Sequence, residues 1–222
     1  MPLITVAVVC YLLGSLPFAH VITRLATGQA IREIGEGNVG ARNVTVSVGR
    51  LAGAATALLD ALKGAAACLF AQRVGGGALG LLVAGLAVMV GHGFPIWLRF
   101  RGGIGLGTAS GFMAVLFPLT MLGSVALFYL LYRLWGDYEL MLIVGFVAIL
   151  LGALLERRSP ALAGVAAAML AVSGLKRLVD DRHRRAVQAR DGWVEPPPAF
   201  APWLRRPRRH SDERRSDGGR PS

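Results

Sequence analysis

Long apolar runs separated by short polar segments dominate this chain. The runs are Leu3–Leu25, Leu51–Gln72, Leu79–Leu98, Thr108–Leu134, Leu140–Leu155 and Leu162–Val179. Runs of roughly 16–24 apolar residues match a helix that crosses a bilayer. Apolar and polar residues do not alternate within them, as they would in the strands of a membrane barrel. The pattern therefore predicts an all-α, polytopic membrane protein.

The run Thr108–Leu134 decides the number of spans. It is too long for one straight span, and Pro118 sits near its centre. Because proline interrupts a helix, this run is either one kinked helix or two short ones. Two helices give about seven spans and place the basic C-terminal tail on the same side as Arg32 and Arg99, as the positive-inside rule prefers. We therefore expect about seven transmembrane helices, with the N-terminus outside and the C-terminus cytoplasmic.

Composition supports a membrane domain followed by a tail. The chain is 54% hydrophobic with a mean hydropathy of +0.54, which excludes an ordinary soluble domain. The formal net charge is +11, and the segment Lys176–Arg220 holds 13 of the 24 basic residues. We expect residues 1–180 to form the transmembrane domain. Residues 181–222 are expected to form a basic, Pro/Arg-rich, disordered cytoplasmic tail that binds anionic headgroups rather than nucleic acid.

Metal and disulfide chemistry are not indicated. Cys10 and Cys68 both lie inside apolar runs, where a cysteine reads as a small core residue. No spacing of histidine, cysteine or carboxylate residues resembles a metal-ligand set. We expect neither a metal nor a cofactor.

The first polar loop, Arg32–Asn43, carries the densest candidate chemistry. Its glycines can take positive φ, so that successive N–H groups point into one concavity that suits an anion. Arginine and asparagine side chains would add donors that match phosphate oxygens. A flexible, positive-inside connector is the alternative. The candidate phosphate-binding residues here are Arg32, Gly37, Asn38, Gly40, Arg42 and Asn43.

A second glycine loop repeats this chemistry. Arg99 and Arg101 precede Gly102, Gly103 and Gly105, and a helix follows. A helix N-terminus preceded by glycines favours anions, although the spacing is not that of a P-loop. Both loops are expected on the cytoplasmic side. Together they predict a phosphate-handling site at a membrane surface.

Three further polar residues lie within apolar runs. Asp60 and Lys63 are three residues apart and share one helical face. They form either a neutral pair that fastens helices together or the rear wall of a polar site. His92, within Gly91–Pro95, is either a supporting residue of that site or an interfacial histidine.

Several segments, in order, resemble the bacterial acyl-phosphate:glycerol-3-phosphate acyltransferases, a membrane-integral family. The resemblance covers roughly residues 10–180. It rests on Tyr11–Phe18, Ile31–Gly35, Gly37–Ala41 with Asn43, Leu59–Gly64, Gly91–Pro95, Phe100–Gly105 and Lys176–Leu178.

The resemblance implies an enzyme of phospholipid synthesis in the bacterial cytoplasmic (inner) membrane. It would move an acyl group from acyl-phosphate to glycerol-3-phosphate, its expected ligands. No catalytic residue is assigned. Each of the family's two substrates carries a phosphate group, which would explain why the chain has two candidate phosphate-binding loops.

The chain also departs from the family pattern. The family has serine, threonine, arginine and lysine where this chain has Glu36, Arg42, Val46 and Ile104, and histidine and asparagine where it has Ala171 and Gly174. Isoleucine supplies no charge to a phosphate. A degenerate relative is therefore an alternative: it would bind a phospholipid or acyl-phosphate, or regulate an active paralogue, without turnover. A small transporter is a third hypothesis, against which the missing internal repeat argues.

Overall fold

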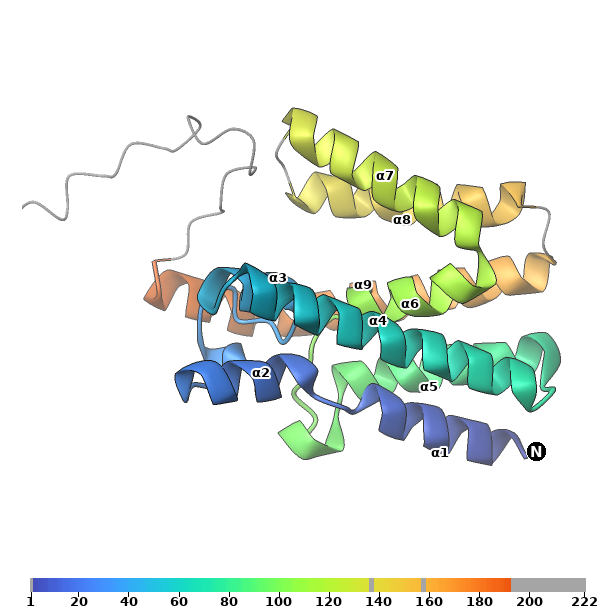
Figure 1. Ribbon diagram of the computed structural model, residues 1–222, viewed down its shortest axis with the longest axis horizontal. Helices are drawn as coiled ribbons and strands as arrows, with labels where there is room; N and C mark the ends of the chain where they lie inside the picture. The colour runs from blue at the N-terminus through green and yellow to red at the C-terminus, as the bar shows by residue number, and fades with distance from the viewer. Residues whose placement is uncertain (1, 136–137, 157–158, 193–222) are drawn as a thin grey trace, which may run out of the picture.

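The computed structural model describes residues 2–135, 138–156 and 159–192, which form helices and no strands (Figure 1). This confirms the all-α prediction for that part of the chain. The elements are α1 (Leu3–Gly14), α2 (Phe18–Thr27), η1 (Ile31–Glu33), α3 (Ala41–Ser47), α4 (Arg50–Arg73), α5 (Gly77–Gly93), η2 (Ile96–Leu98), α6 (Leu106–Leu116), α7 (Pro118–Trp135), α8 (Tyr138–Leu155) and α9 (Pro160–Arg190).

Helix lengths support a membrane protein. Four stretches of the described residues are long and apolar enough to span a bilayer: Leu3–Thr27, Arg50–Arg73, Gly77–Leu98 and Pro160–Arg190. Three shorter apolar helices accompany them, at Leu106–Leu116, Pro118–Leu134 and Ile143–Leu155.

The first apolar run is two helices rather than the single helix that we expected. Helix α1 ends at Gly14 and α2 begins at Phe18. Pro17 has no N–H to give to the Leu13 carbonyl, so the helical ladder stops there, and the Leu16 carbonyl lies in the break between the two helices. That carbonyl accepts a hydrogen bond from Lys63 Nζ at 3.0 Å. The break thus supplies a polar atom to the centre of the bundle.

The expected division at Pro118 is confirmed. Helix α6 ends at Leu116, and Pro118 is the first residue of α7. Proline suits this position, because the first N–H of a helix has no partner in the helix. The carboxylate of Glu156 accepts from the Thr120 N–H in the first turn of α7. A residue from the end of α8 therefore caps α7.

Glycines allow α4 and α6 to pack closely. A Cβ added at Gly64 would lie 1.9 Å from the Thr108 carbonyl oxygen, and one at Gly111 would lie 1.8 Å from the Ala61 carbonyl oxygen. Small residues at a helix crossing let two backbones approach, as is common in membrane bundles. Phe112, which follows Gly111 in α6, is fully buried in the core.

The helices run back and forth, so that polar segments far apart in sequence gather at one end (Figure 1). The first polar loop, η2 and the C-terminal end of α9 lie at that end. The N-terminus and the turn between α4 and α5 lie at the opposite end. We call the first of these the loop end.

Helix α9 is longer than predicted. We expected order to be lost from about Arg182, but the helix continues to Arg190, with Arg184 and Val187 buried. The helix therefore continues past the predicted domain boundary at residue 180. The added turns pack against the first loop, which satisfies their charged side chains. The remainder of the expected tail, residues 193–222, lies outside the described residues.

Candidate active site

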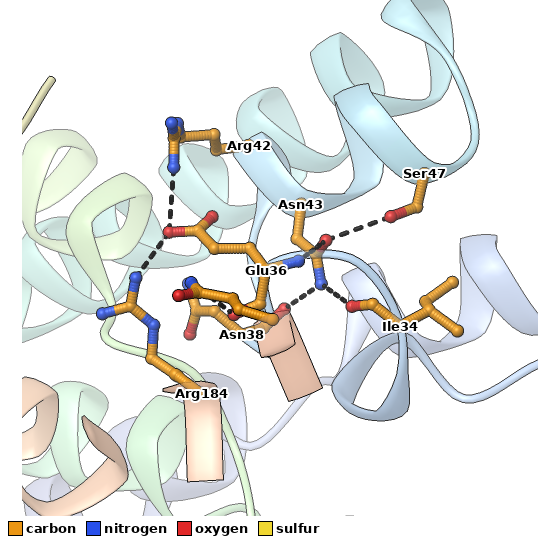
Figure 2. Close-up of polar contacts among 8 residues, drawn as sticks. Ile34, Glu36, Asn38, Arg42, Asn43, Ser47 and Arg184 are labelled. Carbon is orange, nitrogen blue, oxygen red and sulfur yellow. Dashed lines mark hydrogen bonds and ion pairs between the residues drawn. The ribbon is translucent and has the colours of Figure 1, made fainter. Parts of the chain in front are cut away.

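Asn43 braces the first loop from within. Its side chain is buried, and Nδ2 donates to the carbonyl oxygens of Ile31 (2.9 Å), Ile34 (3.0 Å) and Asn38 (2.9 Å), as Figure 2 shows for the last two. Its Oδ1 accepts from the Glu36 N–H at 2.9 Å. With its donors given to the backbone, Asn43 shapes the loop and offers no free N–H to a ligand in this conformation.

Glu36 lies between two guanidinium groups (Figure 2). Its Oε1 is 3.0 Å from Arg42 Nη1 and 2.7 Å from Arg184 Nη2. The Glu36 side chain is 3% exposed. Arg42 is one of the predicted phosphate-binding residues, whereas Arg184 comes from the part of α9 that we expected to be tail. The negative charge of Glu36 is therefore neutralised within the chain.

The last turns of α9 hold the first loop through six residues, here called the α9 clamp. Its members are Asp180, His183, Arg184, Gln188, Arg190 and Asp191. Charged and amide side chains of the clamp bond mostly to loop backbone, which fixes the loop path as well as its side chains.

The clamp's polar contacts lie along the first part of the loop, residues 32–36. Asp180 Oδ1 pairs with Arg32 Nη2 at 3.1 Å, and His183 Nε2 donates to the Arg32 carbonyl at 3.1 Å. Asp191 Oδ2 accepts from the Gly35 N–H at 3.0 Å. The neighbouring Arg190 guanidinium and the Gly35 N–H hold the pKa of the Asp191 carboxyl below its ordinary value.

Gly37 permits the closest approach of loop and clamp. It has a φ of +71°, and a Cβ at this position would lie 3.2 Å from the Arg184 Cα. Glycine is therefore required both by the left-handed backbone and by the contact with α9. Its N–H donates to the Ile34 carbonyl, so it too is used within the loop. Gly37 acts through the shape of the backbone.

The two glycine loops meet, as the sequence predicted. Arg32 Nη1 donates to the Gly102 carbonyl at 3.2 Å. A Cβ at Gly103 would lie 2.0 Å from the Val39 carbonyl oxygen. The N–H groups of Gly102 and Gly103 donate to the carbonyls of Gly93 and His92. These glycines therefore bring the backbones together, and in this conformation their N–H groups are not offered to an anion.

A small polar chamber lies behind the loops. Lys63 Nζ is 2.8 Å from Asp60 Oδ1, and both side chains are buried. His92 Nδ1 lies 3.8 Å from the same oxygen and 3.1 Å from Thr108 Oγ1, with which it shares a hydrogen bond. The chamber has a volume of about 10 Å³, enough for one water molecule. The three supporting residues predicted from the sequence are thus brought together.

A basic groove opens on the other side of the loops. It has a volume of about 290 Å³ and is lined by His20, Arg32, Arg99 and Arg101, by the carboxylate residue Glu33, and by Trp97 and others. Arg99 and Arg101 are exposed, and Arg99 takes a φ of +51°, in the left-handed region. Val39 and Leu98 line both the groove and the chamber, so they form the partition between the two.

Of the remaining positions that the sequence singled out, some are buried near the site and others are exposed. Gly40 precedes α3 and adjoins the Asn38 side chain, whose Nδ2 would lie 3.0 Å from an added Cβ. Ile104 is buried, at 6% exposed, whereas Val46 is exposed. Ala171 is exposed, and a Cβ at Gly174 would meet no atom within 4 Å. These two positions of α9 face away from the site.

Sequence reasoning assigned no site role to Lys176, Asp180 or Arg184, which α9 directs inward, although Lys176 lies in one of the segments that resemble the family. Lys176 pairs with Asp180, and both are buried. The signal was present in the spacing: the buried residues Ser173, Lys176, Asp180, Arg184 and Val187 recur at three or four residues. A stripe of this period marks an inward face even when its members are polar.

The fold and site define a class: a multi-pass helical membrane protein with a polar, arginine-rich site at one end of its bundle. Within that class, the glycerol-3-phosphate acyltransferase family model matches residues 4–188. The chain belongs to this family.

Curated relatives and solved structures agree with this assignment. A glycerol-3-phosphate acyltransferase of Rhizobium meliloti is 38% identical over 178 residues, covering 80% of this chain and 83% of that protein. One from Allorhizobium ampelinum is 47% identical over 115 residues. That match covers 50% of this chain and 55% of the relative, so the chain spans about half the length of that relative.

The fold matches that of PlsY (YgiH), described as an integral membrane glycerol 3-phosphate acyltransferase. Its crystal structure in the glycerol 3-phosphate form has a TM-score of 0.75 at 28% identity, and covers 85% of this chain and 93% of that one. The lysophosphatidic acid form has a TM-score of 0.72 at 27% identity.

Proposed function

We propose that this protein transfers an acyl group from acyl-phosphate to glycerol-3-phosphate, in phospholipid synthesis. The observation that supports the proposal is the structural match to PlsY in its glycerol 3-phosphate form, which covers 93% of the PlsY chain. The relatives reported above are named for the same activity. None of these matches points to a non-catalytic relative or to a transporter.

The phosphate groups are assigned to the loop end. Exposed Arg99 and Arg101, with Arg32 beside them, give the basic groove a concentration of positive charge suited to a phosphate dianion. Arg32 is 15% exposed and already oriented by Asp180 and Gly102, which lowers the cost of ordering it around a ligand. The glycines at positions 37, 40, 102, 103 and 105, with Asn38, Arg42 and Asn43, shape and support this groove.

The acyl chain is assigned to an apolar groove between α6, α7 and α8. Its volume is about 220 Å³, and Gly107, Met121, Phe128 and Phe146 are among the residues that line it. A Cβ at Gly107 would lie 3.1 Å from Asp60 Cβ, so this groove reaches the wall of the polar chamber. An acyl-phosphate lying along it would bring its carbonyl carbon towards the phosphate site.

The reaction then needs positioning more than a strong nucleophile. The glycerol hydroxyl oxygen forms an ester bond with the acyl carbon, the bond from that carbon to the phosphate oxygen breaks, and phosphate leaves with the hydroxyl proton. Arginines that hold both phosphates would supply proximity and stabilise the developing charge. The Asp60–Lys63–His92 chamber supports the loops from behind.

The topology that we propose with this function has seven membrane spans. Helices α1 and α2 together form one span, and α6 is a short span. The N-terminus is outside, and the loop end and the C-terminus are cytoplasmic, in the bacterial inner membrane. Arginines concentrated at the loop end support this orientation. Exposed Trp97 of η2 is a residue type typical of a membrane interface, on either side of the bilayer. Single cysteines at Gly76 and Gly40 should label from opposite sides of the membrane; labelling from the same side would contradict it.

The activity is tested with purified protein, acyl-phosphate and glycerol-3-phosphate, by following lysophosphatidic acid. Complementation of an acyltransferase-deficient bacterium is the cellular counterpart. Arg101→Ala should lower kcat/KM by at least about ten-fold, the effect of losing one charge-assisted contact. Arg73→Ala, at the opposite end of the bundle, is the matched control. No product from wild-type protein that binds glycerol-3-phosphate would refute the transferase proposal and favour the binding-only alternative.

A further inference from the structure

The apolar groove between α6, α7 and α8 has a near end and a far end. At the near end, an added Cβ at Gly107 would lie 3.1 Å from Asp60 Cβ, so the groove meets the wall of the polar chamber there. Helix α7 leaves α6 at the side of the bundle opposite the loop end and runs back towards the loop end (Figure 1). Among the lining residues of α7, Phe128 is therefore near the chamber and Met121 is far from it.

The far end of the groove is closed. Met121 of α7 and Ile149 of α8 are 8% and 9% exposed, and both belong to the same core cluster as fully buried Phe117. Just beyond them α7 and α8 approach closely, because an added Cβ at Gly152 would lie 2.5 Å from Thr120 Cγ2. We call Met121 and Ile149 the groove floor. A chain that enters from the chamber side meets this floor.

The side of the groove is open. Val125 of α7 lines the groove, and its side chain is 55% exposed. In the proposed topology this face of α7 meets the hydrocarbon of the bilayer. A hydrocarbon chain that is longer than the groove therefore continues by turning sideways, past Val125, into the lipid.

The depth of the groove determines where that turn falls along the chain. Met121 and Phe128 are seven residues apart on α7, a rise of about 10 Å. An extended hydrocarbon chain covers this depth with about eight carbon–carbon bonds, so the turn falls roughly at the ninth carbon. A saturated or trans chain is straight and must be bent at this point, whereas a cis double bond placed there already supplies the bend.

We propose that Met121 and Ile149 determine acyl-chain specificity, and that the preferred donor has a long chain with a cis double bond near its middle. The inference rests on the proposed function for the identity of the donor, and it concerns only the shape of the chain. Straight chains are accepted less well. Apolar pockets discriminate weakly between similar substrates, so a preference of about ten-fold in kcat/KM is expected.

The test compares geometric isomers of one donor. Cis and trans isomers of a long-chain acyl-phosphate, with the double bond at about the ninth carbon, compete for transfer to glycerol-3-phosphate. One isomer carries an isotopic label, and mass spectrometry of the lysophosphatidic acids gives the cis-to-trans ratio. Because the isomers share length and composition, the ratio reports chain shape. Moving the double bond to the methyl end should bring the ratio close to one.

Variants of the floor should change this ratio. Met121→Ala deepens the groove, so a straight chain fits and the ratio should fall by about four-fold, the value of one methylene group. If Met121→Ala does not fold, Ile149→Val should lower the ratio in the same direction. Leu122→Ala is the matched control: this neighbour of Met121 is 69% exposed, and the ratio should not change. A general loss of stability would lower transfer of both isomers equally and leave the ratio as it was.

The contrary results are equally defined. A wild-type ratio near one, or a ratio unchanged in Met121→Ala and Ile149→Val, would overturn the inference and leave acyl transfer itself standing. If no acyl-phosphate gives product, the proposed function fails, and the comparison is made by binding. Cis lysophosphatidic acid should then raise the unfolding midpoint in detergent more than the trans isomer does, and Met121→Ala should remove the difference. Equal stabilisation of wild-type protein by both isomers would again overturn the inference.

Discussion

Substitution of Asn43 tests how the first loop is built. Its amide donates to three carbonyls, and its oxygen accepts from the Glu36 N–H and the Ser47 hydroxyl, at 2.9 and 3.0 Å. Asn43→Ala leaves the Glu36 N–H without its acceptor and several carbonyls short of a donor. Unsatisfied buried groups cost about 1–3 kcal/mol each, so a loss of about 3–5 kcal/mol is expected.

Asn43→Asp separates donor from acceptor. The introduced carboxylate can still accept from Glu36 and Ser47, but it places an oxygen about 3 Å from the carbonyls of Ile31, Ile34 and Asn38, at the present Nδ2 positions. It should therefore destabilise the protein at least as much as Asn43→Ala at neutral pH. Acid should narrow the gap between the two variants, because a protonated carboxyl donates once.

Thermal unfolding of detergent-solubilised protein measures this series. For a chain of this size, about 3–5 kcal/mol corresponds to a midpoint lowered by about 6–20 °C. Ser47→Ala is the control, since it removes a single hydrogen bond worth about 1 kcal/mol. An Asn43→Asp protein as stable as wild type would refute the donor role and reverse the assigned orientation of the amide.

Three further results are expected. Gly111→Val should prevent folding, because its side chain meets the Ala61 carbonyl at 1.8 Å, whereas Gly123→Val on α7, where an added Cβ meets nothing within 4 Å, should fold; size-exclusion profiles of the two compare them directly. Truncation after Gly192 should leave monodisperse protein that binds anionic vesicles less, while truncation after Val179 removes the α9 clamp and should cause aggregation. Ile104→Lys should raise affinity for glycerol-3-phosphate about ten-fold or more by calorimetry, with Ile104→Met unchanged, and a folded lysine variant without that gain would show that position 104 lies apart from the phosphate.

The sequence predicted the positions of the membrane helices better than it predicted where the last helix, α9, ends. Apolar runs identify the membrane helices because the bilayer imposes a length on them, and Pro118 marks a break by its missing N–H. The last turns of α9 carry His183, Arg184 and Gln188, which are predicted to be a solvated tail when only apolar periodicity is counted. Their helicity depends on partners in residues 32–36, and tertiary contacts of this kind leave no apolar signal in the sequence.

The sequence predicted which residues gather at the candidate site better than it predicted what each of them does there. The meeting of the two loops, and the grouping of Asp60, Lys63 and His92, follow from charge and glycine placement. The direction in which a polar side chain or N–H group points cannot be predicted from charge and glycine placement. Asn43 and Gly102 were assigned to phosphate, and the structure shows their donors turned to the backbone. Local composition cannot separate a donor that faces a ligand from one that braces its own loop.

The shortness of α6 determines the depth at which chemistry would occur. Its 11 residues rise about 16 Å, roughly half of the hydrocarbon thickness. In the proposed topology, the Gly102–Gly105 segment that precedes it would therefore lie below the membrane surface instead of on it. Under the proposed function, a water-soluble acceptor would descend to this level to meet an acyl donor held in the lipid. The product, carrying a hydrocarbon chain, would then depart sideways into the leaflet without crossing water.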